Sequence, residues 1–417
     1  MSQRKKTIGI ICTLDTKGQH ALYVKGLLER RGHRALTIDT GVLGAPSFVA
    51  DVTREEVAAA AGFDVKDLAA LGDRGTALSA MMTGASTVVL QLHRRGGLDG
   101  IIGIGGGSGT AVASAAMRGL PFGFPKVMLS TMAGGDVAPY VGTKDIAMLS
   151  SVTDIMGMNP ILRRILANAA GAIAGMVEAA AVIEDGPEAL TRRTVAITAF
   201  GVTTPAAVRC HALLEEAGCN TMIFHANGTG GRAMEELIAQ GDIDAVLDLT
   251  TTELADELCG GRRSAGPRRL EAAGCKGIPQ VVLPGAMDMV NFGPPDTVPA
   301  RYAKRLLYRH SPSTTLLRTT PEENAILGKW LGEKIARSRG PSVLVLPLGG
   351  FSEYDREGGV FYDPHADRAF MDAAATALGD RATVVKVDAR INDPECADRA
   401  VRLLLGLMGQ AEQHRAS

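Results

Sequence analysis

A cluster of glycines directly after a short apolar run is the feature that most constrains how this chain can fold. Residues 100–105 read Gly-Ile-Ile-Gly-Ile-Gly, and the glycine- and hydroxyl-rich segment 106–110 then leads into the helical pattern of 111–118. A buried strand, a tight turn and a helix start, in that order, are typical of parallel α/β sheets. Free amides and the partial positive charge of a helix N-terminus bind phosphate or carboxylate groups. The segment therefore predicts an anion site, with a nucleotide as the expected ligand.

The rest of the chain repeats this alternation of strand and helix. In the first half we predict strands at 7–12, 35–39, 100–104 and 126–130, with helices at 19–31 and 76–94. The pair Asn159-Pro160 predicts the start of a helix that runs to about residue 184, because Asn caps helices and Pro suits their first position. The second half restarts the pattern with six predicted strands, at 194–199, 221–225, 245–249, 280–283, 342–346 and 383–387. Its predicted helices cover 205–217, 230–240, 298–309, 321–338, 364–378 and a last one from residue 394.

These patterns predict an α/β protein with two Rossmann-like subdomains, each a mostly parallel sheet flanked by helices. We place an N-terminal nucleotide-binding domain at residues 1–187 and a C-terminal domain at 188–417. Two segments suggest a distant repeat: residues 11–16 are similar to 198–204, and 103–110 are similar to 225–231. Chance similarity between two strand-to-helix turns explains these matches equally well.

Composition excludes several classes of partner. The net charge is −1, so no overall field favours nucleic acid. The longest apolar stretch, 161–183, contains Arg163, Arg164, Asn168 and Glu178, which argues against a membrane span. The six cysteines have no paired short spacing, and the N-terminus lacks the apolar core of a signal peptide. We therefore expect a cytoplasmic protein with reduced cysteines, bound to neither nucleic acid nor membrane.

The glycine-rich segment fits neither of two familiar nucleotide motifs. A P-loop needs a lysine beside its glycines, and no lysine lies between Lys66 and Lys126. A dinucleotide fingerprint follows the first strand of its domain, whereas this segment comes late. Lys17, just after the first predicted strand, is the expected source of positive charge. Asp15 is expected to hold Mg²⁺ or a ribose hydroxyl, although capping of the following helix by Asp15 or Thr16 is an equal alternative.

The segment after the strand at 126–130 adds hydroxyls and Asp136, which with Asp15 is a candidate Mg²⁺ ligand; an ordinary turn is the alternative. The predicted nucleotide-binding residues are Thr13, Asp15, Thr16, Lys17, Gly105, Gly106, Gly107, Ser108, Gly109, Thr110 and Thr131.

Polar residues also follow three successive strands of the second domain, which predicts a second pocket there. Its candidate acid–base residues are His225, Glu253 and Asp288. Weaker candidates are His310, Arg318, Asp363 and His365. The basic loop with Arg262, Arg263, Arg268 and Arg269 is expected to be solvated surface, and an anion-gripping flap is the less favoured interpretation.

Seven segments together resemble an uncharacterised bacterial and fungal family that shares the amino-terminal domain of the tomato mosaic virus resistance protein. These segments are Thr7–Gly18, Gly103–Thr110, Ser130–Asp136, Asp248–Glu257, Leu283–Gly293, His310–Glu323 and Leu346–Pro364. The resemblance extends to about residue 405. It implies an ATP-binding domain with two Rossmann-like subdomains that forms a homodimer, and it implies no accepted catalytic activity. In the plant protein this region inhibits viral RNA replication, a role that nothing in this sequence supports.

The leading hypothesis is an ATP- and Mg²⁺-binding protein with a ligand cleft between two α/β domains, coupling ATP to a small-molecule substrate. One alternative is an enzyme acting on a small acidic metabolite, with its acid–base site in the second domain. Another is a non-catalytic module whose partner binding depends on nucleotide.

Overall fold

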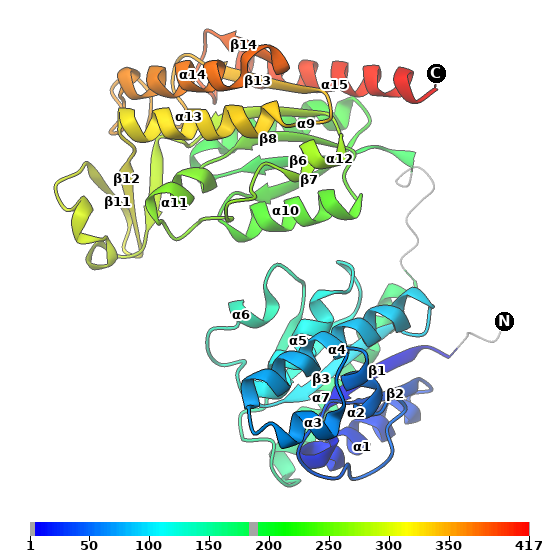
Figure 1. Cartoon of the computed structure of the whole chain (residues 1–417). Coiled ribbons are helices and arrows are strands. Elements are labelled where there is room, and N and C mark those ends of the chain that lie inside the picture. Colours follow the sequence, from blue (N-terminus) through cyan, green and yellow to red (C-terminus); the bar gives the residue numbers. More distant parts are fainter. Residues whose placement is uncertain (1–4, 183–190, 417) are drawn as a thin grey trace. The chain divides into compact units, whose positions relative to one another are not determined.

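The computed structural model describes residues 5–182 and 191–416, and the chain divides into two compact units between Glu184 and Asp185. We call them unit 1 and unit 2 and describe each by itself (Figure 1). The domain boundary predicted near residue 187 lies outside the described residues. The predicted fold class is confirmed: each unit contains a parallel sheet flanked by helices.

Unit 1 is built on a five-stranded parallel sheet in the order β2-β1-β3-β4-β5. Its strands are β1 (Thr7–Cys12), β2 (Arg34–Asp39), β3 (Gly100–Gly105), β4 (Lys126–Ser130) and β5 (Ala147–Ser150). Every residue of β1, β3 and β4 is buried, as expected for strands covered on both faces. Strand β5 was not predicted from the sequence; it is a short strand at the sheet edge, and its residues are half-buried or exposed.

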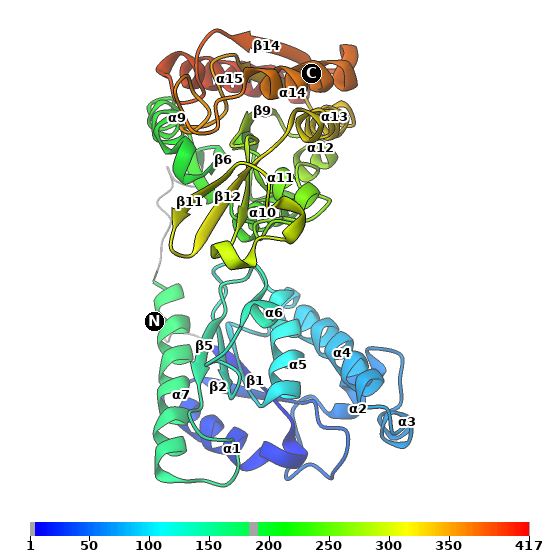
Figure 2. The same ribbon diagram turned by 90° about the vertical axis from the view of Figure 1, so that its left-hand side faces the viewer.

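Two layers of helices cover this sheet (Figure 2). Helices α1 (Leu14–Arg30) and α7 (Pro160–Ala180) pack on one face through a common apolar core. Helices α4 (Arg74–Arg94) and α5 (Gly107–Arg118) cover the other face, together with the short α2 (Arg54–Ala59) and α3 (Val65–Ala70). A further short helix, α6 (Ala138–Val141), follows β4.

The local signals explain where these helices begin. Asn159 accepts a hydrogen bond from the Leu162 amide at 2.8 Å, which confirms the predicted cap of α7. Helix α1 starts at Leu14, directly after β1 and earlier than the predicted residue 19, and Lys17 interrupts it with non-helical angles (φ −126°, ψ 16°). The early start brings residues 13–17 to the carboxyl end of β1.

Unit 2 contains a six-stranded parallel sheet in the order β14-β13-β9-β8-β6-β7. Its strands are β6 (Thr194–Ala199), β7 (Asn220–His225), β8 (Ala245–Thr250), β9 (Gln280–Gly285), β13 (Ser342–Pro347) and β14 (Thr383–Val387). Counted within each unit, both sheets follow the order 2-1-3-4-5, and unit 2 adds a sixth strand. In this order the matched segments 11–16 and 198–204 both follow the first strand of their sheet, whereas 103–110 follows a third strand and 225–231 a second, so the second match does not join equivalent loops.

Helices α9 (Thr204–Glu216) and α15 (Pro394–Ala416) pack on one face of the unit 2 sheet. The remaining helices are α10 (Thr229–Gln240), α11 (Glu253–Cys259), α12 (Ala272–Lys276), α13 (Pro321–Ala336) and α14 (Pro364–Leu378). Short 3₁₀ turns lie at Gly201–Thr203, Pro295–Thr297, Ala300–Tyr302 and Gly379–Arg381. Over the described chain no helix combines the length and the apolar character needed to cross a bilayer.

A separate three-stranded antiparallel sheet in unit 2 corrects one prediction. It comprises β10 (Met289–Phe292), β11 (Leu307–Ser311) and β12 (Thr314–Arg318), in the order β10-β12-β11. The helix predicted at 298–309 is wrong: only a 3₁₀ turn forms at Ala300–Tyr302, and Leu307 pairs with Leu317 across the hairpin. Pairing with a strand later in the sequence outweighs the local helical periodicity here.

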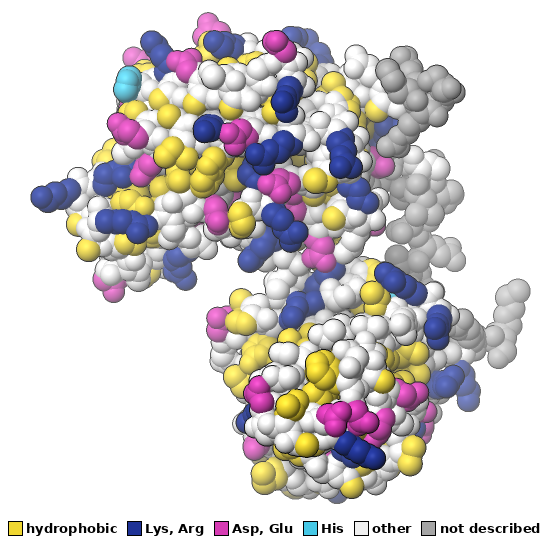
Figure 3. Space-filling model, in the orientation of Figure 1, with side chains coloured by type: hydrophobic (Ala, Val, Ile, Leu, Met, Phe, Trp, Pro, Cys, Tyr) yellow, Lys and Arg dark blue, Asp and Glu magenta, His cyan; other side chains and the backbone are white. Residues whose placement is uncertain are grey.

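Figure 3 shows acidic and basic side chains interspersed over the visible face of unit 2.

Candidate functional site

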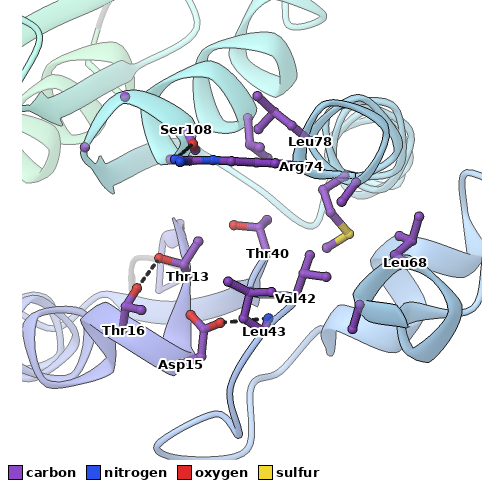
Figure 4. A pocket seen from close by; sticks show the side chains of 18 of the residues that line it. Thr13, Asp15, Thr16, Thr40, Val42, Leu43, Leu68, Arg74, Leu78 and Ser108 are labelled. Atoms are coloured by element: carbon purple, nitrogen blue, oxygen red, sulfur yellow. Dashed lines mark hydrogen bonds between the residues drawn. The ribbon is translucent and has the colours of Figure 1, made fainter. Parts of the chain in front are cut away.

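A cavity of about 600 Å³ lies at the carboxyl edge of the unit 1 sheet. It is lined by residues that follow β1, β2 and β3, and by α3 and α4 (Figure 4). In the order β2-β1-β3, chain connections leave β1 and β3 in opposite directions, which makes this the topological switch point of the sheet. Ligands of open α/β sheets bind at such points, and the volume is in the usual range for small-molecule sites.

The start of α5 supplies unpaired hydrogen-bond donors to this cavity. The first helical bond runs from the Thr110 amide to the Gly106 carbonyl at 2.8 Å, and no side chain caps the helix. Within the described chain, the amides of Gly107, Ser108 and Gly109 have no acceptor. All three residues line the cavity. Three free amides at a helix N-terminus form a site for an oxyanion.

Steric contacts separate the glycines that the fold needs from those that it does not. A Cβ on Gly105 would lie 2.7 Å from the Cα of Gly109, and one on Gly103 would lie 2.5 Å from the sulfur of Met128. By contrast, a Cβ on Gly107 would meet nothing closer than 3.9 Å, and one on Gly109 nothing closer than 3.6 Å. Neither internal packing nor a positive φ requires glycine at 107 and 109. Their lack of side chains leaves the amides open to a ligand.

Positive charge comes from Arg74, which the sequence analysis missed. This first residue of α4 extends over the cavity and donates a hydrogen bond to the Ser108 hydroxyl at 2.8 Å (Figure 4). Its partner is neutral, so the guanidinium retains its capacity to pair with an anion. Lys17 also lines the cavity, and within the described residues its ammonium forms no hydrogen bond or ion pair.

Asp15 supplies the one carboxylate in the cavity lining apart from Asp73, which caps α4. The Oδ2 atom of Asp15 accepts hydrogen bonds from the amides of Leu43 and Gly44, each at 3.2 Å. Its Oδ1 atom is buried and has no partner in the described chain. A free carboxylate oxygen beside an oxyanion site fits a Mg²⁺ ion that takes its other ligands from phosphate and water. The predicted capping by Asp15 is not observed, because no side chain caps α1.

Part of the cavity lining is apolar. It is formed by Val42, Leu43, Leu68, Ala69, Ala77, Leu78, Met81 and Val112, which we call the apolar wall. Leu43 is 87% exposed although it lines the cavity. The site therefore suits a ligand with an anionic end and a flat or apolar end.

Of the predicted nucleotide-binding residues, the cavity brings together Thr13, Asp15, Thr16, Lys17, Gly106, Gly107, Ser108 and Gly109. The others lie outside its lining. Gly105 packs against the first turn of α5, and the buried Thr110 hydroxyl pairs with the Ser130 hydroxyl at 2.6 Å. Thr131 donates its amide to the Gly105 carbonyl, and Asp136 accepts a hydrogen bond from the Ala138 amide. Of the two candidate Mg²⁺ ligands, Asp15 lines the cavity and Asp136 does not.

In unit 2 the carboxylate of Glu253 is buried and bound to backbone amides. The side chain is completely buried, and its Oε1 atom accepts hydrogen bonds from the amides of Gly228 (2.6 Å) and Gly231 (3.1 Å). This glycine loop, at the start of α10, is the one predicted to match the loop of unit 1. Here the chain's own carboxylate occupies the amides.

Arg269 compensates this buried charge. It donates to Glu253 at 2.6 Å, to Asp248 at 2.7 Å and to Glu235 at 3.2 Å, and it is only 1% exposed. The prediction that the basic loop is solvated surface is therefore wrong for Arg269. The loop folds inward there because carboxylates from three elements surround the guanidinium.

Asp288 is completely buried as well, beside Arg318, Asp355 and Asp367. Its Oδ2 atom accepts a hydrogen bond from the Ser352 hydroxyl at 2.8 Å, while Oδ1 has no partner in the described chain. Burial, followed by the charge of Asp355, raises the pKa of Asp288 to about 7. Burial also raises the pKa of Asp367 to about 8, although Arg318 donates to it at 2.9 Å. Among described residues no cluster of three metal-ligating side chains is found.

The remaining unit 2 candidates lie near the surface. His225 is exposed at the end of β7, and His310 accepts or donates a hydrogen bond with the Tyr354 hydroxyl at 2.9 Å. Asp363 caps α14 by accepting from the amides of His365 and Ala366. The predicted acid–base residues His225, Glu253 and Asp288 thus lie in three different environments.

Comparison of the amino-acid sequence with known proteins identifies the family of this chain. The sequence model for the N-terminal domain of Uncharacterised protein family UPF0261 matches residues 6–182, and the model for its C-terminal domain matches 192–408. The chain belongs to the UPF0261 family. A UPF0261 protein of Clostridium tetani is 46% identical over 404 residues, covering 97% of this chain and 99% of that protein.

The predicted relation to the tomato protein is also confirmed. The ToMV resistance protein Tm-1(GCR237) of Solanum lycopersicum is 39% identical over 333 residues, which cover 79% of this chain and 44% of the tomato protein. A putative UDP-N-acetylglucosamine 2-epimerase from Listeria monocytogenes aligns with 67% of this chain and 79% of its own, at 12% identity and a TM-score of 0.21. A likeness that low carries no functional argument. The presence of this family in fungi, the binding of ATP and the formation of a homodimer remain predictions.

Proposed function

We propose that unit 1 binds ATP with Mg²⁺ in the cavity at the carboxyl ends of β1 and β3. The main support is the set of free amides at residues 107–109, which line the cavity. Arg74 and Lys17 line the same cavity, and neither forms an ion pair with a described residue. Amides, a helix dipole and cations act on the same anion, and each is stronger where water is partly excluded.

In this proposal the phosphates occupy the start of α5, where Arg74 and Lys17 balance their charge. Asp15 offers its free Oδ1 atom to the metal ion, which would bridge to phosphate oxygens. The base and ribose lie along the apolar wall, where the exposed Leu43 side chain becomes covered. No acid–base group of unit 2 is needed for binding.

The burial of Glu253 and Asp288 gives the small-carboxylate enzyme less support than ATP binding. Both carboxylates are inaccessible, and Glu253 already pairs with Arg269. Phosphoryl transfer depends on positioning and electrostatics, so ATP binding is compatible with either catalysis or a nucleotide-dependent interaction. Steady ADP release by the purified protein would favour catalysis, and binding without turnover would favour an interaction module.

Calorimetric titration of the full chain with ATP and Mg²⁺ tests the proposal, and Gly107→Asp is the informative variant. A carboxylate here fits sterically and is compatible with a helix N-terminus, so the fold is expected to survive. It would repel phosphate, and juxtaposed like charges cost several kcal/mol, so we expect a loss of about 100-fold or more in affinity. Gly134→Asp is the matched control: Gly134 is exposed, has an open environment and lies outside the cavity lining.

Arg74→Gln provides a second variant that leaves the glycine loop unchanged. A hydrogen bond between charged groups contributes about 1.5–3 kcal/mol, so we expect a loss of about 10- to 100-fold. Arg94→Gln, at the exposed end of the same helix, should bind ATP like the unmodified chain. Unchanged affinity in both Gly107→Asp and Arg74→Gln would refute the proposed site, as would the absence of ATP binding by the unmodified protein.

A further inference from the structure

The ring of Phe200 organises a cluster of cationic and aromatic side chains on unit 2. Phe200 directly follows β6, and His225, the last residue of β7, stacks on it with ring centroids 5.3 Å apart and an interplanar angle of 23°. Arg263 lies on the segment that follows β8 and α11, and its guanidinium carbon is 4.9 Å from the centre of the same ring. Segments that follow three neighbouring strands therefore converge at one point on the carboxyl edge of the sheet.

Both polar side chains of this cluster have unused hydrogen-bonding groups. Within the described residues the guanidinium of Arg263 forms no hydrogen bond or ion pair, whereas the His225 ring bonds to the Ala199 backbone through one nitrogen, which leaves the other nitrogen for a ligand. Arg263 is half-buried, and burial lowers its pKa, while the charge of Asp256 acts in the opposite direction without forming an ion pair with the guanidinium. A partly desolvated cation usually has an anionic partner, because removing charge from water is unfavourable.

Hydrogen bonds and close packing fix the backbone at Arg263. The buried carboxylate of Asp256 accepts hydrogen bonds from the Arg263 amide at 3.0 Å and from the Asn291 amide at 3.1 Å. The loop also packs tightly on the start of α10, since a Cβ on Gly228 would lie 2.7 Å from the Ser264 carbonyl oxygen. These contacts fix the position of Arg263, which reduces the entropy that an incoming ligand would have to remove.

We propose that Arg263 and His225, packed on Phe200, form an anion site that takes the phosphate or carboxylate group of a small molecule. The site is separate from the unit 1 cavity and does not depend on ATP binding there. The guanidinium would contact two oxygens of the anion, and the imidazole would donate a third hydrogen bond when protonated. His225 acts here as a ligand for the anion, and the proposal assigns it no acid–base step.

Protonation of His225 gives the site a diagnostic pH dependence. Partial burial of the imidazole lowers the pKa of His225 and the nearby charge of Arg263 lowers it further, while a hydrogen bond to the Ala199 backbone and the charge of Glu253 oppose this effect. A bound anion stabilises the imidazolium and therefore raises this pKa. The affinity for the anion should consequently increase as pH falls and level off once free His225 is fully protonated.

The test is an NMR titration of the full chain carrying ¹³C-labelled histidine, with inorganic phosphate and succinate as separate probes. His225→Gln assigns the resonance, and Gly107→Asp is used as background so that unit 1 does not compete. We expect saturable shifts of the His225 signal, a raised pKa in the bound state, and affinity at least about 10-fold weaker in Arg263→Gln, which removes a charged hydrogen bond. Arg268→Gln, an exposed arginine of the same loop, should match the background protein.

Each result of this titration either supports or overturns the proposal. Saturation by phosphate alone, or by succinate alone, supports the site and identifies the oxyanion. Shifts that do not saturate, or that persist unchanged in Arg263→Gln, overturn the proposal. Because the readout is a unit 2 histidine, failure of this proposal leaves ATP binding by unit 1 unaffected, and the reverse also holds.

Discussion

Replacing Arg269 with methionine should destabilise unit 2 severely, because the guanidinium is the counter-charge for three carboxylates. It donates to Asp248, Glu253 and Glu235 and is 1% exposed. Methionine has a similar length and fills much of the same space, so the change isolates charge and hydrogen bonding from packing. Removal of one partner from a buried ion pair costs about 3–5 kcal/mol. Here three acidic groups lose their partner together, so this range is a minimum.

The expected cost is a large part of what holds a domain together. Folded domains are stable by about 5–15 kcal/mol, so Arg269→Met is expected to be near the limit of folding. With a urea dependence of about 3 kcal/mol per molar, a loss of 4 kcal/mol lowers the unfolding midpoint by about 1.3 M. Arg269→Lys keeps the charge but loses the planar arrangement of donors, and its midpoint should lie between those of methionine and arginine.

The single tryptophan of the chain makes the assay specific for unit 2. Trp330 lies on α13 and packs against the apolar core beneath it, so its fluorescence follows the unfolding of that unit. The control is Arg268→Met, since Arg268 is the exposed neighbour in the same loop. Arg269→Met with a midpoint within about 0.3 M of this control would refute the argument that the buried carboxylates depend on the guanidinium, since that shift corresponds to about 1 kcal/mol.

Two further predictions concern one glycine pair and one buried acid. Gly105→Ala should destabilise unit 1 by about 1–3 kcal/mol in thermal unfolding, because the new methyl group would lie 2.7 Å from the Gly109 Cα. Gly109→Ala meets no such contact and should retain stability while losing ATP affinity; equal stability of the two variants would contradict this reasoning. The raised pKa of Asp367, about 8 against about 4 in the unfolded chain, means that the folded state retains a proton that the unfolded state releases. Unit 2 should therefore lose stability as pH rises from about 4 to about 8, and Asp367→Asn should flatten this slope; a superimposable pH profile would be the contrary result.

The parallel sheets could be predicted from sequence because their signals are local and strong. Buried strands such as β1 and β3 read as continuous apolar runs, and glycines and hydroxyls follow them at the sheet edge. The position of each strand-to-helix loop along its sheet could not be predicted in this way. The loop at 225–231 was matched to the glycine segment of unit 1, yet it follows the second strand of its sheet, whereas the unit 1 segment follows the third.

Two arginines show why the candidate site was harder to predict than the fold. Arg74 lies 34 residues before Ser108, and only the packing of α4 beside α5 brings them together. Its position directly after the cap residue Asp73 was a usable signal, since it places a cation at the start of a helix. Arg269 gave no such signal. In sequence it resembles Arg268, and its burial depends on carboxylates contributed by three other segments.

The shared strand order has a consequence for stoichiometry. A framework that occurs twice in one chain would be expected to take up two equivalents of the same ligand. In unit 2 the equivalent of the start of α5 is the start of α11, which follows the third strand of its sheet and begins with Glu253. The carboxylate of Glu253 binds two amides of the neighbouring glycine loop, while the amides at the start of α5 have no acceptor among the described residues. Nucleotide uptake through such loops should therefore end at one molecule per polypeptide, and the second copy of the framework is free to diverge toward a different task.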